Sequence, residues 1–332
     1  MNIIDNDIFF SIIIPTRNRT DLFLKALDSV IKQSFNGYEI LIIDDGSNDD
    51  NHKKYQNIIK QYSDRVTFLR LIYRPNGHGH CFARNYAVDK SRGKYVGFLD
   101  DDDYWTDTNH LANAFYSITS QNTDVDLYLT NQWAFSVEGE VIKDVWIDDL
   151  PDKLFLNLHA DNNGAYKLTA EQLLVSDNFC HLNCIIVKKS LYQSIGGMDE
   201  CLRYEPDRDI YLRLIDEADN IIHNPNVIAR HNIPDQSKKN NASTVHSDLQ
   251  KKLFQLRAVD KGILFLKNKS VISFCKIRKS YLLKHIAELL LKEKKYDLAL
   301  LYAKEALSIR FSIKWLAYTL LIFLRLITQK GY

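Results

Sequence analysis

The stretch that decides the fold is residues 93–105, GKYVGFLDDDDYW, in which an apolar run ends in four consecutive aspartates. Residues 95–99 have the composition of a strand buried in a sheet. Adjacent carboxylates repel one another and aspartate is a poor strand former, so we expect the strand to end where the aspartates begin. A solvated turn suits one or two aspartates but not four. We therefore expect a divalent cation, Mn²⁺ or Mg²⁺, to neutralise the cluster.

Three further apolar runs precede this stretch and predict buried strands, at residues 9–14, 39–43 and 66–73. Apolar residues at helical spacing lie between them, over residues 20–33 and around residues 83–88. Strands that alternate with helices predict an α/β domain with a mostly parallel sheet.

Unusual polar residues follow three of the predicted strands, at Pro15–Arg19, Asp44–Ser47 and Asp100–Asp103. Ligands of parallel α/β sheets bind at the carboxyl ends of the strands. Asp44–Ser47 taken alone is also a good β-turn sequence. Its place beside the four aspartates favours a role in the same site.

Composition describes a globular chain of 332 residues that is 45% hydrophobic and 26% charged, with a net charge of +1. This composition excludes a disordered, collagenous or disulfide-scaffold protein. The small total hides a strong asymmetry: residues 250–332 hold 18 basic and 5 acidic residues, whereas residues 1–249 hold 25 and 37. An acidic body of net charge −12 is thus followed by a basic tail of net charge +13.

Cysteine usage and the N-terminus favour a cytoplasmic protein. The five cysteines form no CxxC pair, and Cys180, His181 and Cys184 lack the second ligand pair of a zinc site. Residues 1–7 carry two aspartates and no basic residue, unlike a signal peptide. The apolar stretch 315–327 is shorter than the ~20 residues of a spanning helix. We expect the chain to be cytoplasmic, with peripheral attachment to the inner face of the membrane as an alternative.

The chain divides into three parts by pattern: an α/β domain over residues 1–235, a polar linker over 236–248 and a basic helical module over 249–332. Residues 281–307 are predicted to form two helices joined by a turn at 294–297, similar to one tetratricopeptide-type hairpin. Small residues on the helices would allow them to pack closely. One such unit cannot bury its own apolar face. The module must therefore pack on the α/β domain, on flanking helices, on a protein partner or on an anionic membrane.

Several stretches resemble, in order and spacing, the motifs of family 2 glycosyltransferases with a GT-A fold. They are residues 11–19 (SIIIPTRNR), 38–47 (YEILIIDDGS), 83–85 (ARN), 93–105, 196–200 (GGMDE) and 207–214 (DRDIYLRL). The match covers residues 8–235. It implies a Rossmann-like, mixed and mostly parallel sheet flanked by helices, to which this chain adds an all-α C-terminal extension.

The resemblance implies an inverting hexosyl transfer from a nucleoside diphosphate donor, with a UDP-sugar favoured, to a hydroxyl of a glycan or lipid-linked acceptor. Such reactions belong to polysaccharide biosynthesis, and no nucleic-acid partner is expected. A carboxylate can accept the N3 proton of uracil, and a guanidinium pairs well with phosphate oxygens. The residues that match donor-binding positions are Pro15, Thr16, Arg17, Asn18, Asp45, Arg84 and Asp101.

Asp100 and Asp102 match the outer positions of the family's DxD motif and would bind Mn²⁺ or Mg²⁺. The metal acts as a Lewis acid on the departing diphosphate. His231 resembles the position of a third metal ligand or diphosphate contact, although a lone histidine is more often structural.

Asp207 matches the general base that takes the proton of the acceptor hydroxyl. An alternative is that it only stabilises the N-terminus of a helix that begins near Asp209. The family commonly has Glu before this Asp, but this chain has Pro206 there, with Glu205 one residue further back.

Two other functions are weighed against the transferase. Pro206 favours a catalytically inactive GT-A-like scaffold that works through its helical tail. A nucleotidyltransferase would need a glycine-rich phosphate loop near the N-terminus, and a kinase or ATPase a Walker motif; the sequence has neither.

Overall fold

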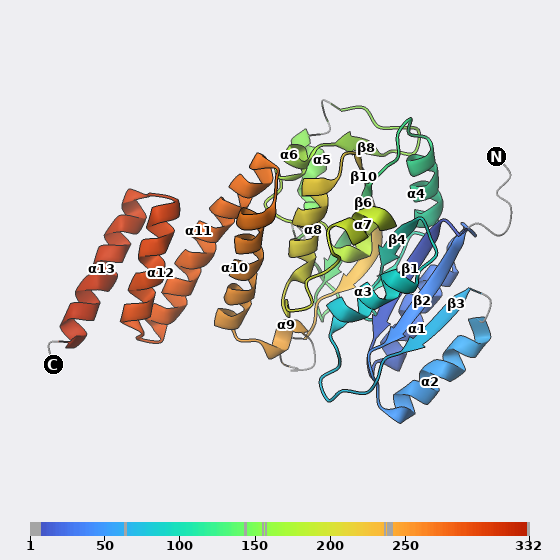
Figure 1. Cartoon of the computed structure of the whole chain (residues 1–332), viewed down its shortest axis with the longest axis horizontal. Helices are drawn as coiled ribbons and strands as arrows, with labels where there is room; N and C mark the ends of the chain where they lie inside the picture. Colours follow the sequence, from blue (N-terminus) through green and yellow to red (C-terminus); the bar gives the residue numbers. More distant parts are fainter. Residues whose placement is uncertain are drawn as a thin grey trace. The chain divides into compact units, whose positions relative to one another are not determined.

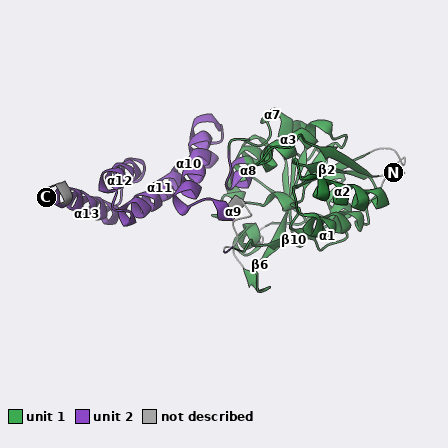
Figure 2. Cartoon of the chain, turned by 90° about the horizontal axis from the view of Figure 1, so that it is seen from below, with its two compact units in different colours: residues 1–201, 210–235 green, residues 202–209, 236–332 purple. Residues whose placement is uncertain are grey.

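The computed structural model describes residues 8–62, 65–142, 145–154, 156, 158–235, 237 and 242–330. The chain forms two compact units (Figure 2). The first comprises residues 1–201 and 210–235, and the second comprises residues 202–209 and 236–332. The segment Leu202–Asp209, which contains Asp207, thus groups with the C-terminal helices. Part of the predicted linker, residues 236 and 238–241, lies outside the described residues.

The first unit contains one large mixed sheet with the strand order β3-β2-β1-β4-β9-β6-β10-β5. β1 pairs in parallel with β2 and β4, and β9 runs antiparallel between β4 and β6. The predicted GT-A-like α/β fold is confirmed. The strands are β1 Phe10–Thr16, β2 Tyr38–Asp44, β3 Val66–Arg70, β4 Tyr95–Phe98, β5 Tyr104–Trp105, β6 Leu127–Phe135, β7 Val141–Ile142, β8 Tyr166–Leu168, β9 Ile185–Lys188 and β10 Ile221–Asn232.

Every residue of β1 and β2 is buried, as expected for central strands of a sheet with both faces covered. The buried polar residues of these strands need partners, and Ser11 and Glu39 are paired with each other. Glu39 accepts a hydrogen bond from Ser11 Oγ at 2.7 Å and forms an ion pair with Arg92 at 2.8 Å. Gly93 donates its backbone N–H to Ser11 Oγ. A Cβ at Gly93 would lie 2.6 Å from the backbone nitrogen of Ser11, so only glycine fits this close approach.

Helices fill the connections between these strands (Figure 1). α1 buries Phe23, Ala26, Leu27 and Val30, which recur every three or four residues. The helices are α1 Thr20–Ile31, α2 Asp49–Ile59, α3 His80–Lys90, α4 His110–Thr119, α5 Leu150–Leu154, α6 Ala170–Leu173, α7 Lys189–Ser194, and α8 Pro206–Glu217, which begins in the second unit and continues in the first.

The second unit is all helical after residue 242. A capping box of Ser247 and Gln250 starts its first long helix, and Asn268 caps the next. Each long helix packs on the one that follows it in the chain. The helices are α9 Ala242–Val245, α10 Asp248–Phe265, α11 Lys269–Lys292, α12 Tyr296–Ile309 and α13 Ile313–Lys330.

The predicted helical hairpin is confirmed and consists of α11 and α12. Ala299, Ala303 and Ala306 of α12 are fully buried, and these small residues allow the two helices to approach closely. Trp315 and Ile322 of α13 complete the same core. Across the described part of the chain, no helix combines the length and the apolar character needed to cross a membrane.

His110, the first residue of α4, generates a prediction about stability. It is fully buried against Trp105, and neither ring nitrogen has a hydrogen-bond partner among the described residues. Burial lowers the pKa of His110 from 6.5 to about 3. Below pH 6.5 the unfolded chain therefore binds a proton that the folded chain does not, and the free energy of unfolding falls as pH falls.

We expect this histidine to reduce the free energy of unfolding by about 1.4 kcal/mol between pH 7.5 and pH 5.5. Urea titrations of the wild type and His110→Leu at both pH values measure it. The variant should lose less stability on acidification than the wild type, whatever its stability at neutral pH. Equal losses would contradict the prediction.

Candidate functional site

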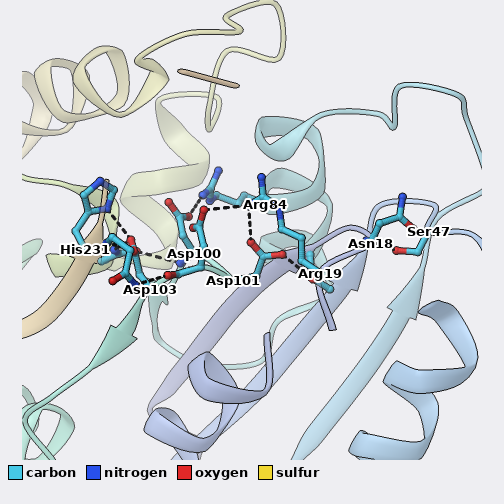
Figure 3. Close-up of polar contacts among 12 residues, drawn as sticks. Asn18, Arg19, Ser47, Arg84, Asp100, Asp101, Asp103 and His231 are labelled. Carbon is cyan, nitrogen blue, oxygen red and sulfur yellow. Dashed lines mark hydrogen bonds and ion pairs between the residues drawn. The ribbon is translucent and has the colours of Figure 1, made fainter. Parts of the chain in front are cut away.

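The carboxyl ends of β1, β2 and β4 lie at one edge of the sheet, because the three strands are parallel. This edge brings together the predicted polar segments (Figure 3). Pro15 and Thr16 belong to the end of β1 itself and are paired with Ile43 and Asp44 of β2. The segments predicted as loops after the first two strands thus begin inside the strands, which holds these residues rigidly.

Two hydrogen bonds join the loop after β1 to the loop after β2. Asn18 adopts a positive φ of 54° and donates its backbone N–H to Ser47 Oγ at 2.9 Å. Its side-chain oxygen accepts the backbone N–H of Asn48 in return. Arg17 donates to the backbone oxygens of Arg74 and Pro75, at 3.1 and 2.7 Å. Three loops that are distant in the sequence are thereby joined.

Asp45 holds the glycine-flanked loop that leads into α3. One carboxylate oxygen accepts the backbone N–H and Nδ1 of His78, and the other accepts the backbone N–H of Gly79. A Cβ at Gly77 would lie 2.4 Å from the same carboxylate. The carboxylate is thus held by hydrogen bonds from a loop that approaches it so closely that glycine is required.

Each of the four aspartates after β4 has its own partners (Figure 3). Asp100 pairs with Arg84 of α3. Asp101 accepts from Thr16 Oγ1 at 2.7 Å and pairs with Arg19 at 3.1 Å, and Arg19 also reaches Asp102 at 3.0 Å. Arg84 of α3 and Arg19, which directly precedes α1, thus supply two positive charges to three of the four carboxylates.

Asp103 is the most deeply placed of the four, since its side chain has no exposed area. It accepts hydrogen bonds from His231 Nδ1 at 2.7 Å, from the backbone N–H of Asn232 at 2.8 Å and from Asn183 Nδ2 at 2.6 Å. Strand β10 and the turn before β9 are thereby tied to the end of β4. Trp146 packs edge-on against the ring of His231.

Proton affinities differ sharply across the cluster. Burial favours a higher pKa for Asp100, but Arg84 and the nearby histidines outweigh it and lower the pKa to about 2. Burial and the neighbouring carboxylates raise the pKa of Asp102 to about 8. Burial would lower the pKa of His231, but Asp103 outweighs it and raises the pKa to about 9. The cluster carries more negative charge than its own partners neutralise.

A divalent cation fits this arrangement. Asp100, Asp102 and Asp103 can bring one carboxylate oxygen each within 4.8 Å of one another, and so can Asp103 together with one nitrogen each of His181 and His231. Carboxylate oxygens are the ligands of Mg²⁺ and Mn²⁺, and an added imidazole suits Mn²⁺ better than Mg²⁺. The raised pKa of Asp102 reflects the repulsion that such a cation would relieve.

The predicted metal residues Asp100, Asp102 and His231 therefore lie together, but the sequence reasoning missed two of their neighbours. Asp103 belongs both to the group of three carboxylates and to the group with His181 and His231, but the sequence pattern assigns it no role beyond the acidic run. His181 was weighed only as a zinc ligand with the nearby cysteines. No local pattern marks His181. It caps the turn Leu182–Cys184 before β9, and only the packing of the sheet brings this turn to the site.

The predicted base, Asp207, lies in the first turn of α8, which begins at Pro206. Proline is well suited to the first helical position, where no intrahelical N–H bond is lost. Glu205 has a positive φ of 51° and accepts from Arg208 and Gln255, at 2.8 and 3.0 Å. Pro206 and Glu205 thus have local structural roles, and Pro206 does not by itself indicate loss of activity.

Asp209, the other carboxylate of this turn, forms an ion pair with Lys261 at 2.9 Å, and its side chain is only 2% exposed. It therefore has a structural role within the second unit. Asp207 is only partly buried. Of the two aspartates, Asp207 is the better match for a residue that reacts with a substrate.

Two solved structures share the fold of this chain at low sequence identity. S. aureus TarS 1-349 in complex with UDP-GlcNAc gives a TM-score of 0.63 at 16% identity, over 91% of this chain and 81% of that one. The mannosyltransferase PcManGT from Pyrobaculum calidifontis, in complex with GDP-Man and Mn²⁺, gives 0.57 at 16% identity, over 96% of this chain and 84% of that one.

Relatives in sequence carry related names. An uncharacterized glycosyltransferase of Rickettsia typhi is 25% identical over 234 residues, which are 70% of this chain and 66% of that protein. A Campylobacter jejuni protein named GalNAc(5)-diNAcBac-PP-undecaprenol beta-1,3-glucosyltransferase is 40% identical over 94 residues, 28% of this chain and 29% of that protein. The sequence model described as Glycosyl transferase family 2 matches residues 11–192, more than half of the chain, and the chain therefore belongs to that family.

Proposed function

We propose that this chain is an inverting glycosyltransferase that moves a sugar from a nucleoside diphosphate, preferably UDP, to a hydroxyl of a glycan or lipid-linked acceptor. The observation that carries the proposal is the cluster Asp100–Asp103 at the end of β4, which unites carboxylates, Arg84 and His231 at one edge of the sheet. The binding of UDP-GlcNAc by TarS and of GDP-Man by PcManGT supports a nucleotide-sugar donor.

Asp45 would bind the base of the nucleotide. One oxygen already accepts two hydrogen bonds from His78, whereas the other accepts the N–H of Gly79 and has a second lone pair for a further donor. The loop contacts hold the carboxylate in a fixed orientation, so it can accept the N3–H of uracil without first losing conformational freedom. Thr16, Arg17 and Asn18 would line the same side of the nucleotide.

Asp100, Asp102 and Asp103 would hold the divalent cation, with His231 as a further ligand or as the partner that orients Asp103. The cation, when bound, stabilises the negative charge of the departing diphosphate. Arg84 orients Asp100 and adds positive charge beside the phosphates. Asp101 is committed to Thr16 and Arg19, so it would shape the donor site through the end of β1.

Asp207 would accept the proton of the acceptor hydroxyl as that oxygen attacks the anomeric carbon. A one-step inverting displacement needs a base on the face opposite the leaving group. Asp207 matches the family's base position and is only partly buried, whereas Asp209 is buried in its ion pair with Lys261. The inactive scaffold has no specific support, because Pro206 is accounted for as the first residue of α8.

One prediction from this proposal concerns the metal. Mn²⁺ at a hundred times its Kd should increase the free energy of unfolding by about 2.7 kcal/mol, seen as a rise in Tm. Asp103→Asn keeps the shape of the side chain but removes the charge that both ligand groups share, so the rise should be lost. Differential scanning calorimetry with and without Mn²⁺ measures it.

A matched control is Asp124→Asn, because Asp124 is an exposed carboxylate that pairs with Lys94 and Lys188 away from the cluster. This variant should keep the full effect of Mn²⁺ on Tm. An Asp103→Asn protein that retained the wild-type rise would show that Asp103 is no ligand. Electron paramagnetic resonance of bound Mn²⁺ gives an independent readout.

The second prediction separates the base from the donor site. Asp207→Asn should lower kcat by roughly 10²- to 10⁴-fold, the usual effect of removing a general base. The Kd for the donor, from calorimetric titration with UDP-sugars and GDP-sugars in Mn²⁺, should stay unchanged. Asp102→Asn should instead abolish metal-dependent donor binding.

Full transfer activity in Asp207→Asn would refute the assignment of the base while leaving the transferase intact. If no nucleotide sugar in the panel bound to or was consumed by the wild type, the transferase proposal itself would fail. The Asp124→Asn protein again provides the control for a change of one charge elsewhere in the chain.

A further inference from the structure

The last helix, α13 (Figure 1), carries a row of large apolar side chains that are exposed. Contiguous exposed apolar patches mark interaction surfaces in proteins. The row and the segment just before it include Phe311, Ile313, Leu316, Leu320, Leu321, Phe323, Leu324 and Ile327, with exposures between 37% and 79%. Ile313, Leu320 and Leu324 are each more than half exposed.

The exposed row is distinct from the face by which α13 packs on α12. Trp315, Thr319 and Ile322 form the packed face and are at least 92% buried. The exposed residues recur at intervals of three and four from Ile313 to Ile327, which places them along another side of the helix. We call this side the α13 stripe, defined by Ile313, Leu316, Leu320, Phe323, Leu324 and Ile327. One apolar side of α13 therefore packs into the core of the second unit, and the other is available to contact a second apolar environment.

Charge identifies that medium. Residues 306–332 contain the four basic residues Arg310, Lys314, Arg325 and Lys330, and no acidic residue. Lys314 and Arg325 are exposed and directly follow Ile313 and Leu324 of the stripe. Long basic side chains at this position can extend to phosphate groups while their aliphatic parts lie along an apolar surface.

We propose that the α13 stripe binds the surface of a bilayer containing anionic lipids, with the helix lying in the headgroup region. Two alternatives fit less well. A second copy packed through the same stripe would bring two sets of basic residues together without an acidic partner. A spanning orientation conflicts with the length and character of α13, as of the other described helices. The inference goes beyond the proposed transfer reaction and does not depend on it.

Vesicle flotation of the full chain tests the proposal without donor or acceptor. The vesicles contain phosphatidylcholine alone, or phosphatidylcholine with about one third phosphatidylglycerol. The wild type should bind the anionic vesicles roughly tenfold more tightly than the neutral ones, and added salt should weaken the binding. The double variant Leu320→Glu/Leu324→Glu should bind the anionic vesicles at least roughly tenfold more weakly than the wild type.

The matched control is Leu264→Glu/Phe265→Glu, which places the same two new charges on side chains of α10 that are each 73% exposed. α11 and α12 lie between α10 and α13 in both views (Figures 1 and 2). This variant should bind like the wild type, and circular dichroism should show equal helix content in all three proteins. Equal binding by the control and the double variant, or no preference for anionic vesicles, would overturn the proposal. The proposal would also be overturned if the wild type did not bind vesicles and light scattering showed that it forms a dimer which the double variant disrupts.

Discussion

The repulsion among four adjacent carboxylates at the end of a buried strand is the constraint on which the rest of the first unit depends. The β4 strand cannot continue through Asp100–Asp103, and the cluster must be neutralised where it stands. Arg84 and Arg19 supply positive charge from α3 and from the start of α1, and Asn183 and Asn232 supply N–H donors. Elements from across the sheet are thereby drawn to one edge.

These partners also explain why the site is poised for a cation. Arg84 pairs with Asp100, whereas Asp102 shares Arg19 with Asp101, and burial and the neighbouring carboxylates raise the pKa of Asp102 to about 8. His231 takes up charge beside Asp103, which raises its own pKa to about 9. Protein groups alone therefore leave part of the repulsion unrelieved. A divalent ion would relieve it without a proton, which would suit the diphosphate of the proposed donor.

Much of the fold could be predicted from the sequence, because buried parallel strands and amphipathic helices carry strong local patterns. The strands at residues 9–14 and 39–43 and the helical hairpin of α11 and α12 are examples. Element ends were less certain: the third strand ends at Arg70 rather than at residue 73, and α8 begins at Pro206 rather than near Asp209. Proline at the first helical position costs no hydrogen bond, so it starts the helix instead of preceding it.

By itself, the sequence determined the order of the motifs, the acidic run, the DDGS turn and the segregation of charge between body and tail, since these depend only on which residues are neighbours along the chain. Tertiary structure alone decided that Asp103, His181 and His231 share one corner, that Asp45 is seated on the loop of His78 and Gly79, and that α13 has a second apolar side left exposed. The physical reason is that such contacts join residues up to 128 positions apart, and only the packing of the sheet and helices brings them within hydrogen-bond distance.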